Sequence, residues 1–363
     1  EKSGLLNRSV EFLPTEEEIA RMLTGAEGFS SPQLSVLMSY VRTGIKNEII
    51  HSDLSEKDLI SHNYLLGYFP KKMVTKFKDS ILKHQLRREI ISTCIANDVI
   101  NKMGCIFINN LVESTGIRVH EAVNIYIVVN HLYNLNSLWH EIDELDGKID
   151  ADLYLQIVRN VQKFIGRVSF WLVKNLGELN LTELDDVTKF RGTIETLGHD
   201  VLDDRLLKIY NHGLTSLVEL NINKDLAKKV ADLRILIYAL DVISIAEQTS
   251  LSIFEAGRVY FKLKSLLRFD MIRTIAVKIK SHSSYWDRSL INDLLDDLSN
   301  YHHKLAVKVI KATDNHVDKV QTWALNDKDY IERYNSFLDE MVASKLDLSK
   351  LILIIRRVKV LAS

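Results

Sequence analysis

The distribution of proline constrains the fold of this chain more than any other feature of its sequence. Three prolines are present, Pro14, Pro32 and Pro70, and none occurs between Lys71 and Ser363. Proline interrupts helices and is common in loops. The long proline-free stretch, in which glycine is also sparse, therefore predicts long helices joined by short connections.

Apolar residues in this stretch recur every three or four positions, the period of a helix with one buried face. Three such stripes are clear: Leu153, Ile157, Val161, Phe164, Val168 and Trp171; then Leu226, Val230, Leu233, Ile237 and Leu240; then Leu348, Leu351, Ile355 and Val358. We find no convincing period-two alternation of the kind that indicates strands. The 363 residues also exceed the length that one hydrophobic core usually serves. The sequence thus predicts an all-α fold, a multi-helix bundle in two subdomains.

Local signals place several helix ends. Thr15 with Glu18 fits an N-terminal capping box, Ser31 followed by Pro32 marks a helix start, and Asp150 is a further N-cap. Glycine is a common helix terminator, so the first long helix should end at Gly104. The expected helices lie near residues 32–50, 71–103, 105–115, 119–133, 136–145, 252–268 and 284–312, with others around the three stripes.

These patterns divide the chain into four parts. Residues 1–70 form a helical segment, and residues 71–175 a first helical subdomain. Residues 176–224, which several glycines punctuate, form an irregular helical connector. Residues 225–363 form a second helical subdomain that includes the C-terminal helix.

The two subdomains share a pattern that indicates an internal duplication. With a shift of 134 residues, identical or similar residues coincide: Glu113 with Glu247, Thr115 with Thr249, Glu121 with Glu255, Ala122 with Ala256, and Tyr126 with Tyr260. With three further residues in the second copy, Ile157 meets Leu294 and Val161 meets Leu298. Self-similarity of this kind is typical of a repeated helical unit.

Composition narrows the class of protein. The 47 basic and 48 acidic residues nearly cancel, so there is no global attraction to nucleic acid or to an anionic membrane. Cys94 and Cys105 are too few for a disulfide framework and indicate reduced thiols. No apolar run is long enough to span a membrane. We expect a cytoplasmic protein with neither nucleic acid nor membrane as its partner.

The N-terminus, Glu1-Lys2-Ser3, has no initiator methionine and no apolar leader segment. This favours a fragment cut from a longer protein, although the removal of a leader would leave the same sequence.

Motifs for a cofactor or for catalysis are missing. A dinucleotide site usually needs a glycine-rich turn between a strand and a helix. No two glycines are spaced GxG, and the closest pair is Gly25 and Gly28. The Walker pattern and the recognisable nucleophile signatures are also missing. We therefore assign no catalytic and no cofactor-binding residue.

One group of side chains could be read as a metal cluster: His302 and His303 with Asp296, Asp297 and His316. Adjacent residues of a helix point about 100° apart, however, so the two histidines do not converge. The pattern is more typical of a solvated helix face, and we assign no metal site.

The helix expected from residue 71 is basic along its first half: Lys71, Lys72, Lys76, Lys78, Lys83, Arg87 and Arg88. Such a run is either a docking surface for an acidic partner or phosphate, or a solvated face, and the solvated face is favoured. Arg87 and Arg88 are the candidate inter-domain contacts, because guanidinium groups suit carboxylates.

Residues 113–122 look like the turn of a helix-turn-helix. A DNA-binding protein should also present a basic recognition helix, and residues 119–134 contain no lysine or arginine. A DNA-binding regulator is therefore the least favoured function.

Several segments resemble one known family in order and spacing. They are LNRSVEFLP at 6–14, SPQLSVL at 31–37, YFP at 68–70, HQLRREIIST at 84–93, ANDVIN at 96–101, LWHEIDELD at 138–146, ALDVI at 239–243, AEQT at 246–249 and VYF at 259–261. Together they resemble the C-terminal region of the large bacterial NAD-specific glutamate dehydrogenases. The likeness is weakest between residues 176 and 224.

The resemblance implies a role without catalysis. In that family the whole enzyme oxidises L-glutamate to 2-oxoglutarate and ammonium with NAD, and the catalytic domain precedes this region. Residues 1–70 would then follow that domain. NAD would be bound by the parent enzyme and no cofactor by this segment, which alone would be inactive. Its partners would be its own catalytic domain and other subunits.

Two alternatives remain. The second hypothesis is a free-standing helical scaffold or interaction module, and the third is the DNA-binding regulator. Binding of the chain to a separately produced glutamate dehydrogenase catalytic domain would distinguish the first hypothesis from both.

Overall fold

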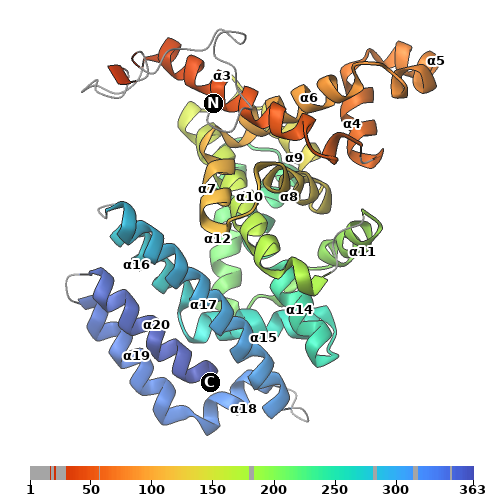
Figure 1. Ribbon diagram of the computed structural model, residues 1–363. Coiled ribbons are helices and arrows are strands. Elements are labelled where there is room, and N and C mark those ends of the chain that lie inside the picture. Colours follow the sequence, from red (N-terminus) through yellow and green to blue (C-terminus); the bar gives the residue numbers. More distant parts are fainter. Residues whose placement is uncertain are drawn as a thin grey trace. The chain divides into compact units, whose positions relative to one another are not determined.

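The structure is a computed structural model that describes residues 17, 20, 21 and 30–363, with the exception of 57, 180–183, 281–283, 314–317 and 344–345. Eighteen α-helices and two short 3-10 helices make up the regular structure of these residues, and none of them lies in a strand (Figure 1). The predicted all-α fold is confirmed. The chain forms two compact units, Glu1–Arg191 and Gly192–Ser363, whereas the predicted four-part division stays a prediction.

Unit 1 is built around α8, a helix buried on nearly all its sides. Ala122, Val123, Tyr126, Val129 and Leu132 are completely buried, which is typical of a helix at the centre of a core. Helices α3, α7, α9 and α10 pack around it. The elements of unit 1 are α3 (Ser31–Ile50), η1 (Leu54–Glu56), α4 (Asp58–Tyr68), α5 (Lys71–Leu82), α6 (Arg87–Met103), α7 (Ile106–Thr115), α8 (Val119–Leu132), α9 (Leu135–Asp143) and α10 (Ala151–Leu179), and α11 (Leu184–Glu195) crosses the boundary.

Unit 2 is organised by the long helix α17, which contacts α14, α15, α16, α18 and α20. Its central residues Leu298, Leu305, Ala306 and Val309 are completely buried. The elements of unit 2 are η2 (His199–Val201), α12 (Asp204–Glu219), α13 (Lys224–Leu236), α14 (Ala239–Thr249), α15 (Ile253–Leu266), α16 (Phe269–Lys280), α17 (Tyr285–Ala312), α18 (Lys319–Asn326), α19 (Lys328–Ala343) and α20 (Leu348–Ala362).

Most predicted helix ends agree with the structure. Gly104 ends α6 with a positive φ of 77°, a conformation that glycine adopts without strain. The carboxylate of Asp150 accepts backbone N–H groups at the start of α10. The capping box predicted at Thr15 and Glu18 lies outside the described residues.

The single long helix expected from Lys71 to Met103 is wrong. The structure has α5 and α6 instead, separated at Lys83–Leu86. At this turn the backbone N–H of Leu86 is donated to Nδ1 of His84, so a side chain replaces a helical carbonyl as acceptor. The break also lets α5 pack on α4 while α6 packs on α3 and α4.

The structure supports the predicted duplication. Helices α7, α8, α9 and α10 correspond in order to α14, α15, α16 and α17, and α8 and α15 begin and end 134 residues apart. Left-handed residues follow at matching positions, Gly116 and Ser250 after the first helix, then Asn134 and Arg268 after the second. The same five helix pairs are in contact in each set. Because turn conformation and packing both agree, the likeness extends beyond a shared helical period.

Among the described residues, no single helix is long and apolar enough to cross a membrane. Helices α6 and α7, which meet at 93°, reach the required length and hydropathy only when they are taken together.

Candidate functional site

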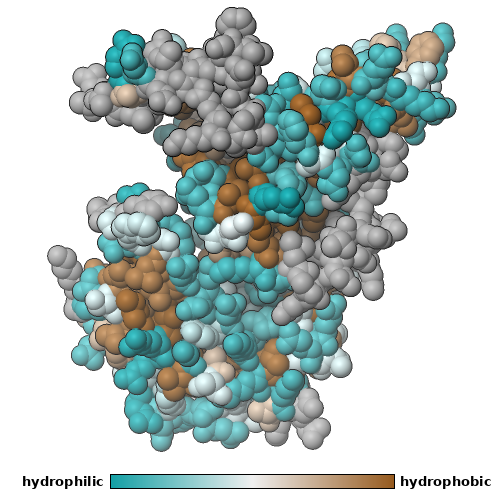
Figure 2. Space-filling model, in the orientation of Figure 1, coloured by the Kyte–Doolittle hydropathy of each residue, from teal (hydrophilic) through white to brown (hydrophobic). Residues whose placement is uncertain are grey.

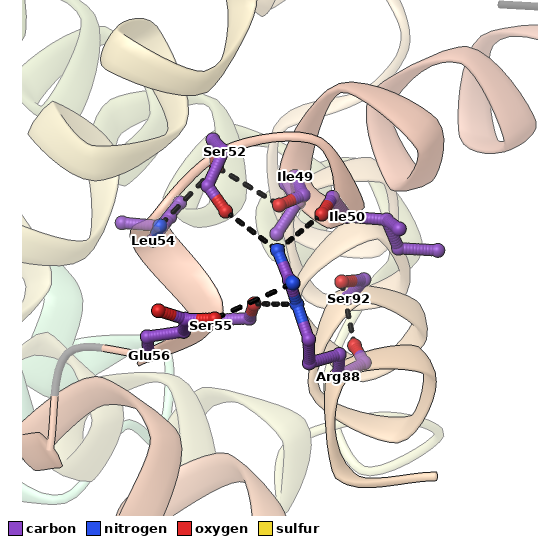
Figure 3. Close-up of polar contacts among 8 residues, drawn as sticks. All are labelled: Ile49, Ile50, Ser52, Leu54, Ser55, Glu56, Arg88 and Ser92. Atoms are coloured by element: carbon purple, nitrogen blue, oxygen red, sulfur yellow. Dashed lines mark hydrogen bonds and ion pairs between the residues drawn. The ribbon is translucent and has the colours of Figure 1, made fainter.

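Arg88 is the polar centre of the N-terminal part of unit 1 (Figure 3). It lies in the first turn of α6, where packing against α3 brings its guanidinium to the end of α3. Its N–H groups are donated to the carbonyl oxygens of Ile50 at 2.6 Å and Ser52 at 3.0 Å, and to the hydroxyl of Ser55 at 3.3 Å. Glu56 forms an ion pair with it at 3.3 Å. A cation thus satisfies carbonyl groups that the end of a helix leaves without partners.

The two predicted inter-domain residues therefore differ in their surroundings. Arg88 is half-buried, and the partners described above belong to its own unit. Arg87, one residue earlier, is exposed. Contact of either residue with another domain stays a prediction.

Asp98 on α6 accepts two hydrogen bonds and forms one ion pair in unit 1. Its Oδ2 accepts the phenol hydroxyls of Tyr64 at 3.1 Å and Tyr126 at 2.9 Å, and its Oδ1 pairs with Lys102 at 2.8 Å. Burial, and then the negative charge of Asp98, raise the pKa of both tyrosines well above the usual range. The phenols stay protonated and act as fixed hydrogen-bond donors.

Unit 2 repeats part of this arrangement 134 residues later. Asp232 on α13 accepts the hydroxyl of Tyr210 at 2.7 Å and pairs with Lys228 at 2.7 Å. In both units an earlier helix supplies a phenol, α4 for Asp98 and α12 for Asp232, and a lysine lies one turn away on the carboxylate's own helix. The carboxylates thus join neighbouring helices.

His302 is completely buried inside unit 2. Its Nε2 lies 3.0 Å from the carbonyl oxygen of Tyr260, to which it donates a hydrogen bond, and its ring stacks on that of Tyr260 at 3.7 Å. Burial, with smaller contributions from Arg273 and Lys264, lowers the pKa of His302 well below the usual range, so the ring is neutral. The solvated helix face expected here is wrong for His302, because the stripe that contains Leu298 and Leu305 carries this position into the core.

The remaining members of the imagined metal cluster do not gather around His302. His303 points to Asp241, with 3.7 Å between their nearest atoms, and Asp297 is exposed. His316 lies outside the described residues. Within the described part of the chain, no group of three or more His, Cys, Asp or Glu side chains is arranged to hold a metal ion.

The predicted helix-turn-helix does form from α7, Gly116 and α8. Its second helix, however, buries nine of its fourteen residues in the core of unit 1. A recognition helix must expose the side chains that read a DNA groove. The position of α8 is incompatible with that role.

These features define a class of protein: an all-helical module whose buried and part-buried ionisable groups hold its own helices together. The family described as glutamate dehydrogenase, C-terminal, matches residues 26–360, and the chain belongs to this family.

Similar proteins carry one common name. The chain is 27% identical to the NAD-specific glutamate dehydrogenase of Pseudomonas aeruginosa over 95% of its length, and 25% identical to that of Mycobacterium tuberculosis over 98%. The enzyme of Halomonas elongata is 23% identical over 94% of the chain. The aligned region covers 21%, 22% and 21% of those three proteins, respectively, so the chain spans about a fifth of their length.

Proposed function

We propose that this chain is the non-catalytic C-terminal helical region of an NAD-specific glutamate dehydrogenase. The parent enzyme would convert L-glutamate, NAD and water to 2-oxoglutarate, ammonium and NADH on a catalytic domain elsewhere in the polypeptide. This region would serve packing, assembly or regulation by contacting that domain and neighbouring subunits.

One observation carries the non-catalytic role. Asp98 and Asp232, which are part-buried, and His302, which is buried, are chemically suited to proton transfer, but each is held by helices of its own unit. Asp98 and Asp232 accept hydrogen bonds from phenols and pair with lysines, while His302 is neutral and enclosed. A general base needs a free acceptor with access to the proton that it removes. The carboxylate oxygens of Asp98 and Asp232 are engaged by these partners, and His302 is enclosed. The sequence also lacks the glycine-rich turn of a dinucleotide site.

The test compares three proteins: the parent enzyme, the parent without this region, and the 363-residue chain alone. The chain alone should produce no NADH from glutamate and NAD. The truncated parent should lose thermal stability or quaternary assembly, because removing a contact surface removes its stabilising binding energy. Glutamate-dependent NADH production by the isolated chain, or a truncated parent with unchanged assembly and stability, would refute the proposal.

A further inference from the structure

Helix α5 presents an exposed surface that is both apolar and basic. It packs against α4 and projects from the rest of unit 1, at the upper right of Figure 1. Met73 is 43% exposed and Phe77 48% exposed, although both are large apolar side chains. Four exposed lysines accompany them on α5: Lys71, Lys72, Lys76 and Lys78. In Figure 2 this end of the unit shows hydrophobic residues beside strongly hydrophilic ones.

The first turns of α5 make this surface continuous up to Phe77, where the backbone leaves helical geometry (φ −129°, ψ 28°). Met73 and Phe77 lie one turn apart, with Lys72 and Lys76 beside them, and Nζ of Lys76 lies 5.4 Å from the centre of the Phe77 ring. Ile81, which follows the kink at Phe77, is buried, so the C-terminal part of α5 serves the fold while Met73 and Phe77 meet solvent.

The internal duplication shows that α5 is an addition to the repeated unit. Helices α4 and α6 of unit 1 correspond to α12 and α13 of unit 2, through the Tyr64–Asp98 and Tyr210–Asp232 hydrogen bonds. Residues 220–223 join α12 to α13 directly, whereas α5 stands between α4 and α6. Unit 2 thus builds the equivalent pair without a counterpart of α5.

A complementary surface lies at the corner between α9 and α10. Leu155 is 44% exposed there. The corner also exposes five carboxylates against one lysine, Lys148: Asp143, Glu144, Asp146, Asp150 and Asp152. Burial, followed by the negative charges of Asp143 and Asp146, raises the pKa of Tyr154, which indicates that these carboxylates gather around a half-buried ring.

We propose that the α5 surface of one copy of the chain docks on the α9–α10 corner of a second copy. The two surfaces belong to the same compact unit and each is exposed within it, so only another molecule can bring them together. Lysines would face carboxylates, and Met73 and Phe77 would cover Leu155 and Tyr154. Charge complementarity of this kind sets orientation and speeds encounter. The contact joins different patches, so it is head-to-tail and builds a ring or a chain.

An anionic membrane is the competing partner of a basic amphipathic helix. The second copy is favoured because α5 has only 12 residues, part of its apolar face is occupied by the fold, and the chain carries a net charge of −1. The proposal rests on the assembly role given above and names the surfaces that would perform it.

The test uses charge reversal in the 363-residue chain. The α5 variant carries Lys72→Glu and Lys76→Glu, the corner variant carries Asp143→Lys and Asp146→Lys, and a combined variant carries all four changes. A matched control carries Lys208→Glu and Lys304→Glu, at exposed positions of unit 2. Sedimentation velocity at low salt gives the dissociation constant of self-association, and circular dichroism verifies that each variant is folded.

The parent chain should self-associate, and the α5 and corner variants should each raise the dissociation constant by at least about 10-fold. The combined variant should return to within about threefold of the parent, since each reversed pair is again complementary. The α5 and corner variants, once mixed, should form heterodimers through their intact surfaces, and the control should behave like the parent.

A chain that stays monomeric, folded variants that associate equally well, or a combined variant that is not restored would overturn the proposal. So would α5-dependent binding to phosphatidylserine vesicles without self-association. None of these outcomes changes the NADH and truncation assays of the parent enzyme, so failure of this proposal is distinguishable from failure of the proposed function.

Discussion

At the scale of single residues, Arg88 illustrates how one side chain ends one helix and positions another. Its planar guanidinium reaches two carbonyl oxygens, one hydroxyl and one carboxylate at the same time. A lysine has one compact ammonium group and cannot reproduce this fork. The end of α3 therefore depends on the shape of the cation as well as on its charge.

We predict that Arg88→Lys lowers the free energy of unfolding by about 1–3 kcal/mol, because the part-buried carbonyls of Ile50 and Ser52 lose their donors. Arg87→Lys is the matched control at the exposed neighbouring position, and it should change that free energy by less than about 0.5 kcal/mol. Urea unfolding followed by circular dichroism measures both. Equal effects at the two positions would contradict the role assigned to Arg88.

His302 makes the stability of unit 2 dependent on pH. Its pKa in the folded state is well below that of an unfolded histidine, so below about pH 6.5 only the unfolded chain takes up the proton. The free energy of unfolding should therefore fall as the pH drops below about 6.5, by up to about 1.4 kcal/mol per pH unit from this group, until the folded ring is protonated.

His302→Gln removes this titration and retains an N–H donor for the carbonyl of Tyr260. Urea unfolding between pH 5 and 8 should show a shallower acid slope for this variant. His212→Gln on α12 is the control, because the ring of His212 is exposed in the folded state. If the free energy of unfolding of His302→Gln fell with pH as steeply as that of the parent chain, other groups would be responsible for the loss of stability in acid.

At the scale of helices, the two copies supply a matched pair of turn residues. Gly116 after α7 and Ser250 after α14 have φ angles of 76° and 55°. Only glycine adopts this left-handed region without a steric penalty. The same turn is thus built from the best residue in one copy and from a strained one in the other.

We predict opposite effects of exchanging these residue types. Gly116→Ala should lower the free energy of unfolding by about 1 kcal/mol, as a Cβ at this φ is strained even though no atom lies within 4 Å of it. Ser250→Gly should raise the free energy of unfolding by about 0.5 kcal/mol, since relief of strain outweighs the added freedom of the unfolded chain. Chemical denaturation of both variants checks the signs, and effects of the same sign would refute the equivalence of the turns.

The predictability of helices from sequence follows the same logic. Gly104 and Asp150 mark helix ends through their own backbone and side-chain chemistry, and their predicted positions agree with the structure. The break between α5 and α6 contains no glycine or proline that could mark it in the sequence. It depends instead on the packing of these helices against α3 and α4. Helix α16 was not anticipated either.

The candidate site was harder to predict, because its partners are distant in the chain. Arg88 bonds to residues 33 to 38 positions earlier, and His302 to a carbonyl 42 positions earlier. Sequence spacing marks which residue types occur on a helix face. It does not reveal which face another helix will cover, so the sequence places His302 in solvent and does not indicate the contacts of Arg88 with the end of α3.

At the scale of the whole molecule, each unit has its own core. In unit 2, η2 and α12 precede the helices of the repeated set and pack on α15 and α13. The contact of η2 is close, since a Cβ on Gly257 of α15 would lie 3.1 Å from Cγ1 of Val201. Both elements belong to the region that the sequence marks as a connector.

We predict that residues 192–363 fold alone with cooperative thermal unfolding, as a unit with its own core should. A fragment of residues 225–363 lacks η2 and α12, exposes the apolar faces that they cover, and should unfold at a lower temperature. Calorimetry of the two fragments distinguishes the structural unit from the predicted subdomain. Equal stability would favour the boundary at residue 225.

The duplication also allows equivalent positions of the two copies to be compared within one chain. Gly116 and Ser250 occupy one turn, and Asn134 and Arg268 the next. The left-handed backbone conformation is therefore the same in both copies although the residues differ. Tyr126 and Tyr260 were retained, both completely buried. The comparison is a substitution experiment that has already been carried out inside one polypeptide. Positions that differ between the copies are the ones through which the two units could acquire separate duties.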